Sequence, residues 1–402
     1  MELRLPGASW RNREGLAELA AVLGAGDGLS RYVGGAVRDT LLGLDVSDID
    51  IATRLVPDDV LARLKAAGIR AVPTGLAHGT VTAVLPSGPV EVTTLRRDVE
   101  TFGRRATVAF SDRWEEDAGR RDFTVNALYA DPLDGALHDY HGGLADLAAN
   151  RIRFIGDPLQ RIAEDHLRIL RFFRFHARFG DEVDDRGLAA CAARANDLMA
   201  LSRERIAAEL LKLLVARSAV PVIALMVEHG IFRAVLPEIT ADGAARMAEL
   251  AAREEAAGVP PDAIRRLAAL IPARAAEGLG ARLKLSNADR RRLELAHLGP
   301  GGEGPRALAY RVGPAVALDR LLLAGEPVDA VRDWTPPGLP LSGGALVARG
   351  LAKGPDVART LRSLETRWVL AGFPEAVPDA WIDQAVGEAI SANAASGGSG
   401  RA

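Results

Sequence analysis

Cysteine and long apolar runs are scarce in this chain, and each scarcity excludes a class of protein. The 402 residues include one cysteine, Cys191, so an intrachain disulfide framework and a cysteine-based zinc site are both excluded. No run of about 18 apolar residues suggests a membrane-spanning helix, and the first ten residues lack the apolar core of a signal peptide. We therefore expect a cytoplasmic protein with no membrane and no disulfide partner.

Lysine is also rare, because almost all of the basic residues are arginine. The formal net charge is −3, which does not indicate a globally basic nucleic-acid binder. A GC-rich genome accounts for most of the arginine usage, but the local clusters need their own explanation. The planar guanidinium group of arginine can donate paired hydrogen bonds to phosphates and base edges. Arginines are concentrated at 96–105, 120–121, 151–178 and 288–292.

The pattern of apolar residues divides the chain into a mixed first part and a helical remainder. A hydrophobic fraction of 48% is ordinary for a protein with a core, and the length suggests two to four domains. Strand signals recur up to residue 150 and nearly vanish afterwards, where apolar residues follow helical spacing. We therefore predict an α+β fold with a mixed sheet in a head, followed by a large all-α part. The expected domains are a catalytic head at 1–150, a helical neck at 151–215, a body and tail at 216–388, and a disordered tail at 389–402.

The segment "DID" at 48–50 places two carboxylates on one side of a predicted strand. Side chains alternate along a strand, so Asp48 and Asp50 point the same way while Ile49 points into the core. Mg²⁺ is commonly held by one or two carboxylates together with substrate phosphates. Asp-x-Asp alone is weak, because most such pairs are solvated turns or caps.

A glycine pair lies upstream of the two aspartates. Gly34 and Gly35 allow close approach of another group to the backbone, and Arg38 follows in a predicted helix where it could contact a triphosphate. A tight strand-to-helix turn without any ligand explains the glycines equally well. Glu91, in "PVEVTTLRRD", is a third acidic candidate, with a solvent-facing strand position as its equal alternative.

These motifs together resemble the signature of class II CCA-adding enzymes and bacterial poly(A) polymerases. The resemblance begins with "GGAVRDTLLG" and "DIDIAT" and continues in order through "VEVTTLRRD", "RRDFTVNAL", "DYHGGLADL", "RIAEDHLRILRFFRF" and "LSRERIAAELLKLL". It covers roughly the first half of the chain densely and thins out beyond it. The resemblance implies a head with a polymerase-beta-like mixed sheet, followed by an all-α neck, body and tail.

The resemblance also implies roles for individual residues. Asp48 and Asp50 would hold catalytic Mg²⁺, with Glu91 beside them, and Gly34, Gly35 and Arg38 would contact the nucleotide's phosphates. The remaining nucleotide-binding residues would be Arg121, Asp122, Asn126, Glu164, Asp165, Arg168, Arg171 and Arg174. A flexible loop that carries Asp98, Gly103, Arg104 and Arg105 would serve the switch from C to A addition.

Asp165 and Arg168 also suggest that protein side chains select the base in place of a nucleic-acid template. If both residues lie on one helical face, the first accepts and the second donates hydrogen bonds, which together match the edges of cytosine or adenine. In isolation, an ordinary surface ion pair between them is the simpler interpretation. The aligned surroundings favour base recognition, with Glu164 orienting Arg168.

The predicted function is template-independent addition of C, C and A to the 3′ end of tRNA from CTP and ATP, with release of pyrophosphate. A poly(A) polymerase of the same superfamily would use the same head with ATP alone and broader RNA ends. A catalytically silent RNA-binding protein on this scaffold is a further alternative. The intact Asp48, Asp50, Asp165 and Arg168 disfavour the silent protein.

Overall fold

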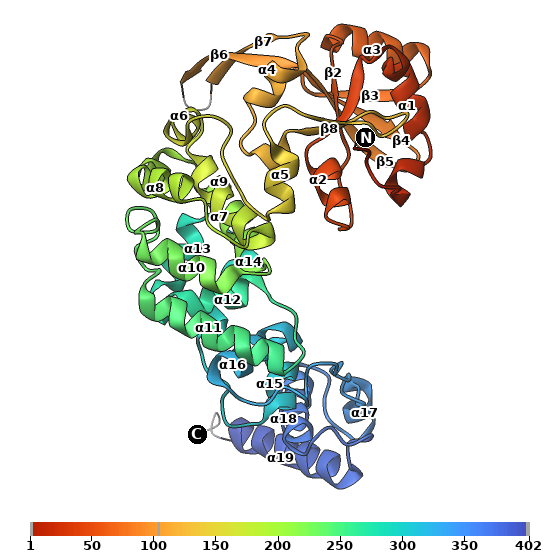
Figure 1. Ribbon diagram of the computed structural model, residues 1–402. Coiled ribbons are helices and arrows are strands. Elements are labelled where there is room, and N and C mark those ends of the chain that lie inside the picture. The colour runs from red at the N-terminus through yellow and green to blue at the C-terminus, as the bar shows by residue number, and fades with distance from the viewer. Residues whose placement is uncertain (1–2, 103–104, 399–402) are drawn as a thin grey trace. The chain divides into compact units, whose positions relative to one another are not determined.

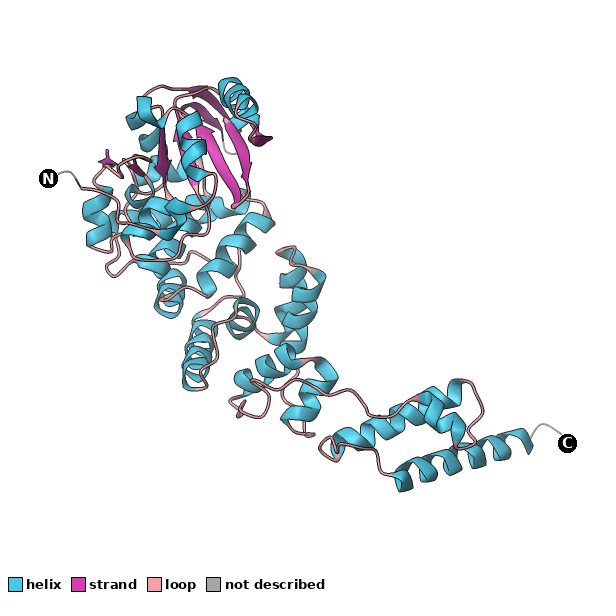
Figure 2. Ribbon diagram, turned by 90° about the vertical axis from the view of Figure 1, so that its right-hand side faces the viewer, coloured by secondary structure: helices cyan, strands magenta, loops and turns pink. Residues whose placement is uncertain are grey.

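The structure is a computed structural model that describes residues 3–102 and 105–398. The chain divides into two compact units, Met1–Ala241 and Asp242–Ala402. Strands occur in the first unit, whereas the described part of the second unit contains helices and loops only (Figures 1 and 2). The α+β fold with a mixed sheet and a large helical part is therefore confirmed. The finer boundaries expected at 150 and 215 stay a prediction.

A seven-stranded sheet forms the frame of the first unit. Its strand order is β3-β4-β5-β2-β1-β8-β9, and β2 and β5 run parallel while the other neighbours run antiparallel. The strands are β1 (Ser30–Val33), β2 (Asp50–Thr53), β3 (Arg70–Gly75), β4 (Thr80–Leu85), β5 (Gly88–Thr94), β8 (Leu128–Ala130) and β9 (Leu137–Asp139). A separate hairpin is made by β6 (Arg96–Phe102) and β7 (Arg105–Phe110).

Ten α-helices complete the described part of the first unit. Helix α2 packs against β1 and β8, and α3 packs against β3 and β4. The helices are α1 (Leu16–Val22), α2 (Gly35–Leu41), α3 (Pro57–Ala66), α4 (Trp114–Gly119), α5 (Gly143–Ala148), α6 (Pro158–Glu164), α7 (Leu167–Phe179), α8 (Asp185–Ala193), α9 (Arg203–Leu214) and α10 (Ala219–Glu228). Short 3-10 turns lie at Ser9–Asn12, Ala25–Asp27, Leu76–His78, Thr124–Asn126 and Ala195–Ala200.

Helix α7 shows how the sequence pattern positions functional side chains. Ile169, Phe172 and Phe173 are fully buried, and Phe172 stacks on Phe154 with ring centroids 5.5 Å apart. Burial of this apolar stripe fixes the rotation of the helix about its axis. The arginines of α7 therefore point along a different face, toward α2 and the segment that follows α4.

The second unit consists of helices, and its interior has a hydrophobic part and a charged part. A hydrophobic cluster with Trp368 and Leu346 fills one part, and an ion-pair network fills another. The helices are α11 (Ala241–Ala256), α12 (Ala263–Leu270), α13 (Ala276–Arg282), α14 (Asn287–Ala296), α15 (Pro305–Val312), α16 (Pro314–Ala324), α17 (Gly343–Ala348), α18 (Pro355–Leu370) and α19 (Asp379–Gly398), with a 3-10 turn at Ala273–Ala275.

Two observations concern the end and the surface of the chain. Helix α19 extends to Gly398, which differs from the disordered tail expected from residue 389, because alanines in "SANAAS" favour a helix.

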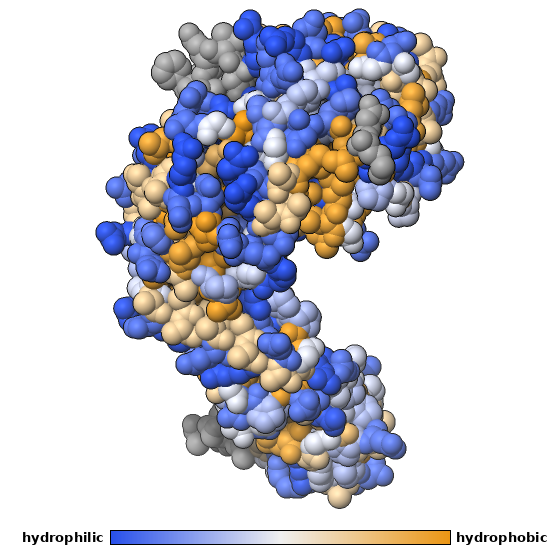
Figure 3. All heavy atoms as spheres, viewed as in Figure 1, coloured by the Kyte–Doolittle hydropathy of each residue, from blue (hydrophilic) through white to orange (hydrophobic). Residues whose placement is uncertain are grey.

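On the face drawn in Figure 3, apolar residues appear as patches among hydrophilic ones. Within the described residues, we find no helix that combines the length and the apolar character needed to cross a membrane.

Candidate nucleotide-binding and catalytic site

A cavity of about 370 Å³ in the first unit gathers most of the predicted site residues. Its walls come from the β1–α2 turn, the segment that leads into β2, the segment after α4, and helix α7. The predicted residues that line it are Gly34, Gly35, Arg38, Asp48, Asp50, Arg121, Asp122, Asn126, Arg171 and Arg174. Asp39, Val46, Ser47, Phe175 and Arg178 complete the lining.

The two aspartates reach the cavity from the start of β2. Ile49 between them is 2% exposed, so the alternation predicted from the sequence is present. Burial and the nearby carboxylates of Glu91 and Asp48 together raise the pKa of Asp50 to about 6, against the opposing effect of Arg121. Neighbouring carboxylates repel each other when both are ionised. A cation bound between them would therefore stabilise their charged forms.

Glu91 stands next to Asp50 but outside the cavity lining. It pairs with Asp50 in the parallel ladder between β5 and β2, which places both side chains on one face of the sheet. Val90 and Val92 are buried while Glu91 is exposed, as the alternation predicted. In the described part of the chain, no group of three or more His, Cys, Asp or Glu side chains is arranged to hold a metal ion.

The glycine turn brings its backbone close to two of the other site residues. Gly34 has φ 69° and ψ −124°, a conformation that side chains with a Cβ rarely adopt. A Cβ at this position would lie 3.5 Å from Nη1 of Arg121 and 3.7 Å from the carbonyl oxygen of Asn126. Both are ordinary van der Waals distances, so the backbone conformation of the turn, and not the space around it, calls for glycine here.

A chain of charged hydrogen bonds links the turn to helix α7. Arg38 donates from Nε to Oδ1 of Asp39 at 2.7 Å and from Nη1 to Oδ1 of Asn126. Asn126 in turn donates to Oδ1 of Asp122 at 2.9 Å, and Arg171 donates from Nε to Oδ2 of Asp122 at 2.7 Å. Burial alone would raise the pKa of Asp122, but Arg171, Asn126 and a backbone N–H hold it below its ordinary value.

The arginines of α7 are fixed by a carboxylate and by aromatic rings. Arg174 donates from Nε to Oε2 of Glu209 on α9 at 2.5 Å, and its guanidinium lies 4.2 Å from the centroid of the Phe175 ring. Arg171 lies 5.3 Å from the same centroid, and Arg178 donates to Oδ2 of Asp39 at 3.2 Å. These contacts restrict the arginines without neutralising all of their charge.

Arg121 is positioned by residues that sequence reasoning did not single out. Its Nη2 donates to Oδ2 of Asp117 at 3.2 Å, and the hydroxyl of Tyr129 donates to the same oxygen at 2.7 Å. Asp117 is 1% exposed. Burial raises its pKa, but Arg121, Arg120 and Tyr129 together lower it to about 2.

Glu164, Asp165 and Arg168 do not line the cavity, and one expectation about them was wrong. Asp165 and Arg168 do not share a helical face, because α6 ends at Glu164 and Asp165 is extended, with φ −149° and ψ 106°. The Asp165 side chain accepts a hydrogen bond from the backbone N–H of Leu167 at 3.1 Å, a local bond that competes with helix continuation.

Both side chains already have protein partners. Oδ2 of Asp165 accepts from Arg205 at 2.8 Å. Arg168 donates to Oε2 of Glu164 at 2.6 Å, so the expected contact between these two residues is present. Its Nη2 also donates to the backbone oxygen of Arg120 at 3.0 Å, which ties α7 to the segment that carries Arg121 and Asp122.

The predicted loop at 98–110 is mostly a hairpin. Asp98 belongs to β6 and pairs with Val108, and Arg105 begins β7 and pairs with Phe102. Gly103 and Arg104 lie outside the described residues. Thr, Val and Phe residues on both strands favour strand pairing, and the flexible role expected for this segment stays a prediction.

Of the residues that the prediction missed, some had a sequence signal and others had none. Arg178 continues the i, i+3, i+4 spacing of Arg171 and Arg174 on α7, and Asp39 follows Arg38 directly. Asp117 and Glu209 act through contacts with residues elsewhere in the fold. Glu209 is 35 positions from Arg174, and no local pattern marks it.

The chain was compared with known proteins. Residues 30–153 match the model of the Poly A polymerase head domain, and residues 182–242 match the probable RNA and SrmB-binding site of polymerase A. The CCA tRNA nucleotidyltransferase 1, mitochondrial, of Danio rerio is 35% identical over 378 residues, which span 88% of this chain and 86% of the relative. The CCA-adding enzyme of Levilactobacillus brevis is 41% identical over 189 residues, 46% of each chain.

The fold has a matching solved structure. The crystal structure of the Bacillus stearothermophilus CCA-adding enzyme in complex with CTP aligns with a TM-score of 0.71 and 26% identity, and it covers 94% of this chain and 98% of that one. The resemblance proposed from the motifs is confirmed by relatives that match nearly the whole chain. The chain belongs to the CCA tRNA nucleotidyltransferase family.

Proposed function

We propose that this protein adds C, C and A to the 3′ end of tRNA from CTP and ATP. The observation that carries the proposal is the single cavity that joins Asp48 and Asp50 to five arginines and to the glycine turn. Relatives that match most of the chain are named for CCA addition, which favours this function over poly(A) synthesis. The paired carboxylates disfavour a silent RNA-binding protein.

The carboxylates suit a hard divalent cation. Asp48 and Asp50 supply oxygen ligands only, and burial of Asp50 beside other carboxylates raises its pKa, so a cation would relieve the repulsion. We propose Mg²⁺, because it is bound by one or two carboxylates together with substrate phosphates. Bound there, it would promote deprotonation of the attacking hydroxyl and balance the charge of the leaving pyrophosphate.

The arginines suit the triphosphate. Arg38, Arg121 and Arg171 line the cavity and are held in place by protein acceptors, so a nucleotide phosphate would share or exchange these partners. Preorganised cations stabilise developing charge without reorganisation at the moment of reaction. Asp122 and Asn126 hold this array together and are proposed to position the ribose and the phosphates.

The reaction assigned to this site is a single displacement at phosphorus. The oxygen of the terminal 3′-hydroxyl of tRNA forms a bond to the α-phosphorus of CTP or ATP. The bond from that phosphorus to the bridging oxygen breaks, pyrophosphate leaves with the bonding electrons, and the hydroxyl proton passes to solvent.

Base selection is proposed for Asp165 and Arg168, in a different geometry from the one first expected. Arg168 is anchored by Glu164 and by the oxygen of Arg120, next to the residues that line the cavity. Asp165 accepts from Arg205, so it contacts a base only when it shares or exchanges this partner. Hydrogen bonds to the Watson–Crick edge would then distinguish C and A from U and G.

The partners and the location follow from the same assignment. We propose CTP, ATP and tRNA as substrates, and a CTP complex is known for the Bacillus stearothermophilus relative. The helical part would contact RNA through shape and phosphate charge. The Danio rerio relative is named as mitochondrial, so the cytoplasmic location expected from the sequence stays a prediction.

The variant Asp50→Asn tests the catalytic assignment. We expect it to lower incorporation of CMP into a tRNA that lacks its 3′ end by about 10³-fold or more, the loss typical of removing a group essential to the transition state. Binding of the same tRNA, measured by filter retention, should stay within about twofold, because Asp50 contacts the reacting groups only. An equal loss of binding and incorporation would contradict the role.

A further inference from the structure

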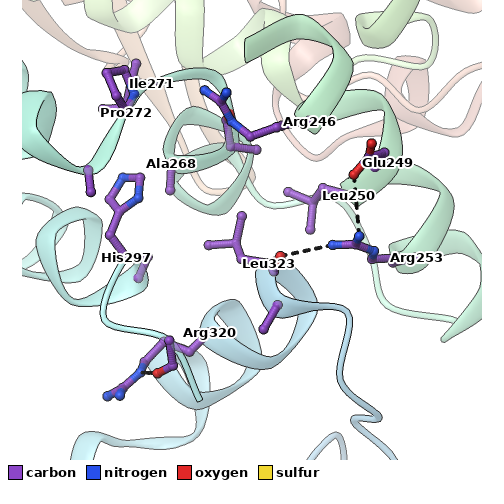
Figure 4. Close-up of a pocket in the computed structure, with 15 residues that line it drawn as sticks. Arg246, Glu249, Leu250, Arg253, Ala268, Ile271, Pro272, His297, Arg320 and Leu323 are labelled. Atoms are coloured by element: carbon purple, nitrogen blue, oxygen red, sulfur yellow. Dashed lines mark hydrogen bonds and ion pairs between the residues drawn. The ribbon is translucent and has the colours of Figure 1, made fainter. Parts of the chain in front are cut away.

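A second cavity lies wholly within the second unit, among α11, α12, α14 and α16. Its volume is about 340 Å³, within the range of about 300–1,000 Å³ that is usual for small-molecule sites. Figure 4 shows Leu250 and Leu323 in its middle, with Arg253 to the right, Arg246 above and His297 to the left. The predicted function does not use any of these residues.

The charged groups of this cavity are mostly cationic. Arg246, Arg253 and Arg320 line it together with one carboxylate, Glu249. The Glu249 side chain is 66% exposed and lies 3.5 Å from Arg253, so it is largely solvated. Arg246 is also exposed, and the Arg253 side chain is 38% exposed, so the excess of positive charge lies at the solvent-facing part of the cavity, where it attracts anions.

Each arginine is held in place by backbone carbonyl groups. Arg246 donates from Nε to the oxygen of Ala269 at 2.9 Å. Arg253 donates from Nη1 to the oxygens of Leu322 and Leu323, where α16 ends. A carbonyl group fixes the guanidinium group without cancelling its charge. In the described part of the chain, the two terminal nitrogens of Arg246 have no hydrogen-bond acceptor of their own.

His297 adds an unsatisfied polar atom to the same cavity. Its Nε2 is buried and has no hydrogen-bond partner among the residues that the structure describes. Burial and the charge of Arg246 lower the pKa of His297, so the ring is neutral near pH 7. Buried polar atoms are nearly always paired, and an unpaired one beside free guanidinium nitrogens indicates a place for a polar ligand group.

The rest of the lining is apolar. Leu250 and Ile271 are each 1% exposed, and Leu323, Pro272 and several alanines surround them. A bare inorganic anion would leave this surface without a partner. A ligand with a flat ring beside its anionic group would satisfy both parts of the cavity.

We propose that this cavity binds a nucleotide, with its phosphate on Arg246 and His297 and its base against Leu250, Ile271 and Leu323. This site is additional to the nucleotide site of the first unit and does not depend on the function proposed for it. Two sources offer the same chemistry, a free ribonucleotide and a nucleotide unit within bound RNA, and the experiment has one arm for each.

The first arm measures AMP binding to the full chain by isothermal titration calorimetry. Two variants, Arg246→Gln and His297→Ala, each remove one proposed phosphate contact. Arg362→Gln is the matched control, because Arg362 is an exposed arginine whose Nε also donates to a backbone oxygen, that of Ala358 at 3.1 Å. A free-nucleotide site predicts a binding component that weakens about tenfold in both variants and not in the control.

The second arm measures tRNA binding as a function of salt. If the source is RNA, both variants weaken tRNA binding relative to Arg362→Gln. Arg246→Gln also reduces the slope of log K against log salt by about one. The kcat for CMP incorporation at saturating CTP and tRNA, which reports the site of the first unit, should not change in any variant, and thermal unfolding checks that each variant folds. If Arg246→Gln unfolds, His297→Ala still tests the proposal. The proposal would be overturned if the folded variants bound AMP and tRNA with the same affinities as Arg362→Gln.

Discussion

Asp117 is the residue on which the position of Arg121 depends. Its carboxylate accepts hydrogen bonds from Arg121, Arg120 and Tyr129 while it is almost completely buried. Of the two arginines, Arg121 lines the nucleotide cavity. Under the proposed function, Asp117 is a positioning residue that would act on the nucleotide through Arg121.

We predict that Asp117→Asn raises the KM for CTP and ATP about tenfold or more, with a smaller change in kcat. The loss corresponds to one charge-assisted hydrogen bond of about 1.5–3 kcal/mol, removed from a residue that binds nucleotide. Steady-state kinetics with a tRNA that lacks its terminal nucleotides measure the two parameters separately.

Asp146→Asn is the matched control for that variant. Asp146 is equally buried and accepts from Arg151, Arg153 and Thr124, but none of these residues lines the cavity. Its replacement should lower stability and leave KM unchanged. If both variants changed KM alike, the effect of Asp117 would be a general loss of structure.

At the scale of elements, α7 combines two tasks on two faces. Its aromatic stripe is buried in the first unit, and its arginines extend from the Glu164 contact at Arg168 to the Asp39 contact at Arg178. One helix therefore sets the positions of the arginines that we propose to contact the base and the phosphates.

The base-reading assignment gives a prediction for α7. We expect Arg168→Gln to reduce the preference for CTP and ATP over UTP and GTP by about tenfold, since one buried hydrogen-bonding partner contributes about 1–3 kcal/mol of discrimination. Misincorporation with each nucleotide alone measures the ratio of kcat/KM values. A uniform loss with all four nucleotides would instead assign Arg168 a role in holding α6 and the Arg120 segment.

The elements that the sequence predicted well have strong local signals. The β1–α2 turn, the exposed Glu91 between buried valines and the apolar stripe of α7 follow from glycine chemistry and periodicity. The break at Asp165 was missed, because an acidic residue inside "RIAEDHLR" looks helical until its side chain bonds Leu167. Strand β3 has a weaker signal, because Pro73 interrupts the strand pattern, although an edge strand tolerates proline.

At the scale of the whole molecule, the second unit contains a buried ion-pair network that no local pattern reveals. Asp319 is fully buried and accepts from Arg292 at 2.6 Å and from Arg265 at 3.4 Å. Burial raises the pKa of Asp319 even with these arginines beside it. Arg265, itself 2% exposed, also donates to Glu254 at 2.7 Å.

We predict that Asp319→Ala lowers the free energy of unfolding by about 3–5 kcal/mol, because it leaves buried cations without their partner. Urea denaturation of the full chain, followed by tryptophan fluorescence, measures the change. In Asp383→Ala, the removed carboxylate is 68% exposed and pairs with Arg349, so the change should stay within about 1 kcal/mol. Equal effects of the two substitutions would contradict the structural role of the network.

The division of the chain into two units could also not be predicted from the sequence. The boundary between Ala241 and Asp242 depends on which helices contact each other across long separations. Glycine and proline interrupt the helical spacing near this boundary as they do elsewhere in the helical part, so composition alone does not single it out. The family motifs, by contrast, identified most of the cavity lining, because they carry the local chemistry of the site.

The most direct test of the function is a product-length assay with purified protein, Mg²⁺ and a tRNA that lacks its 3′ CCA. The RNA is offered CTP alone, ATP alone, or both, and the products are resolved at single-nucleotide length. The account predicts that CTP alone adds two nucleotides and that a third appears only when ATP is also present. Long ladders from ATP alone would contradict it and indicate a poly(A) polymerase, and no extension under any condition would contradict the assignment of a catalytic site.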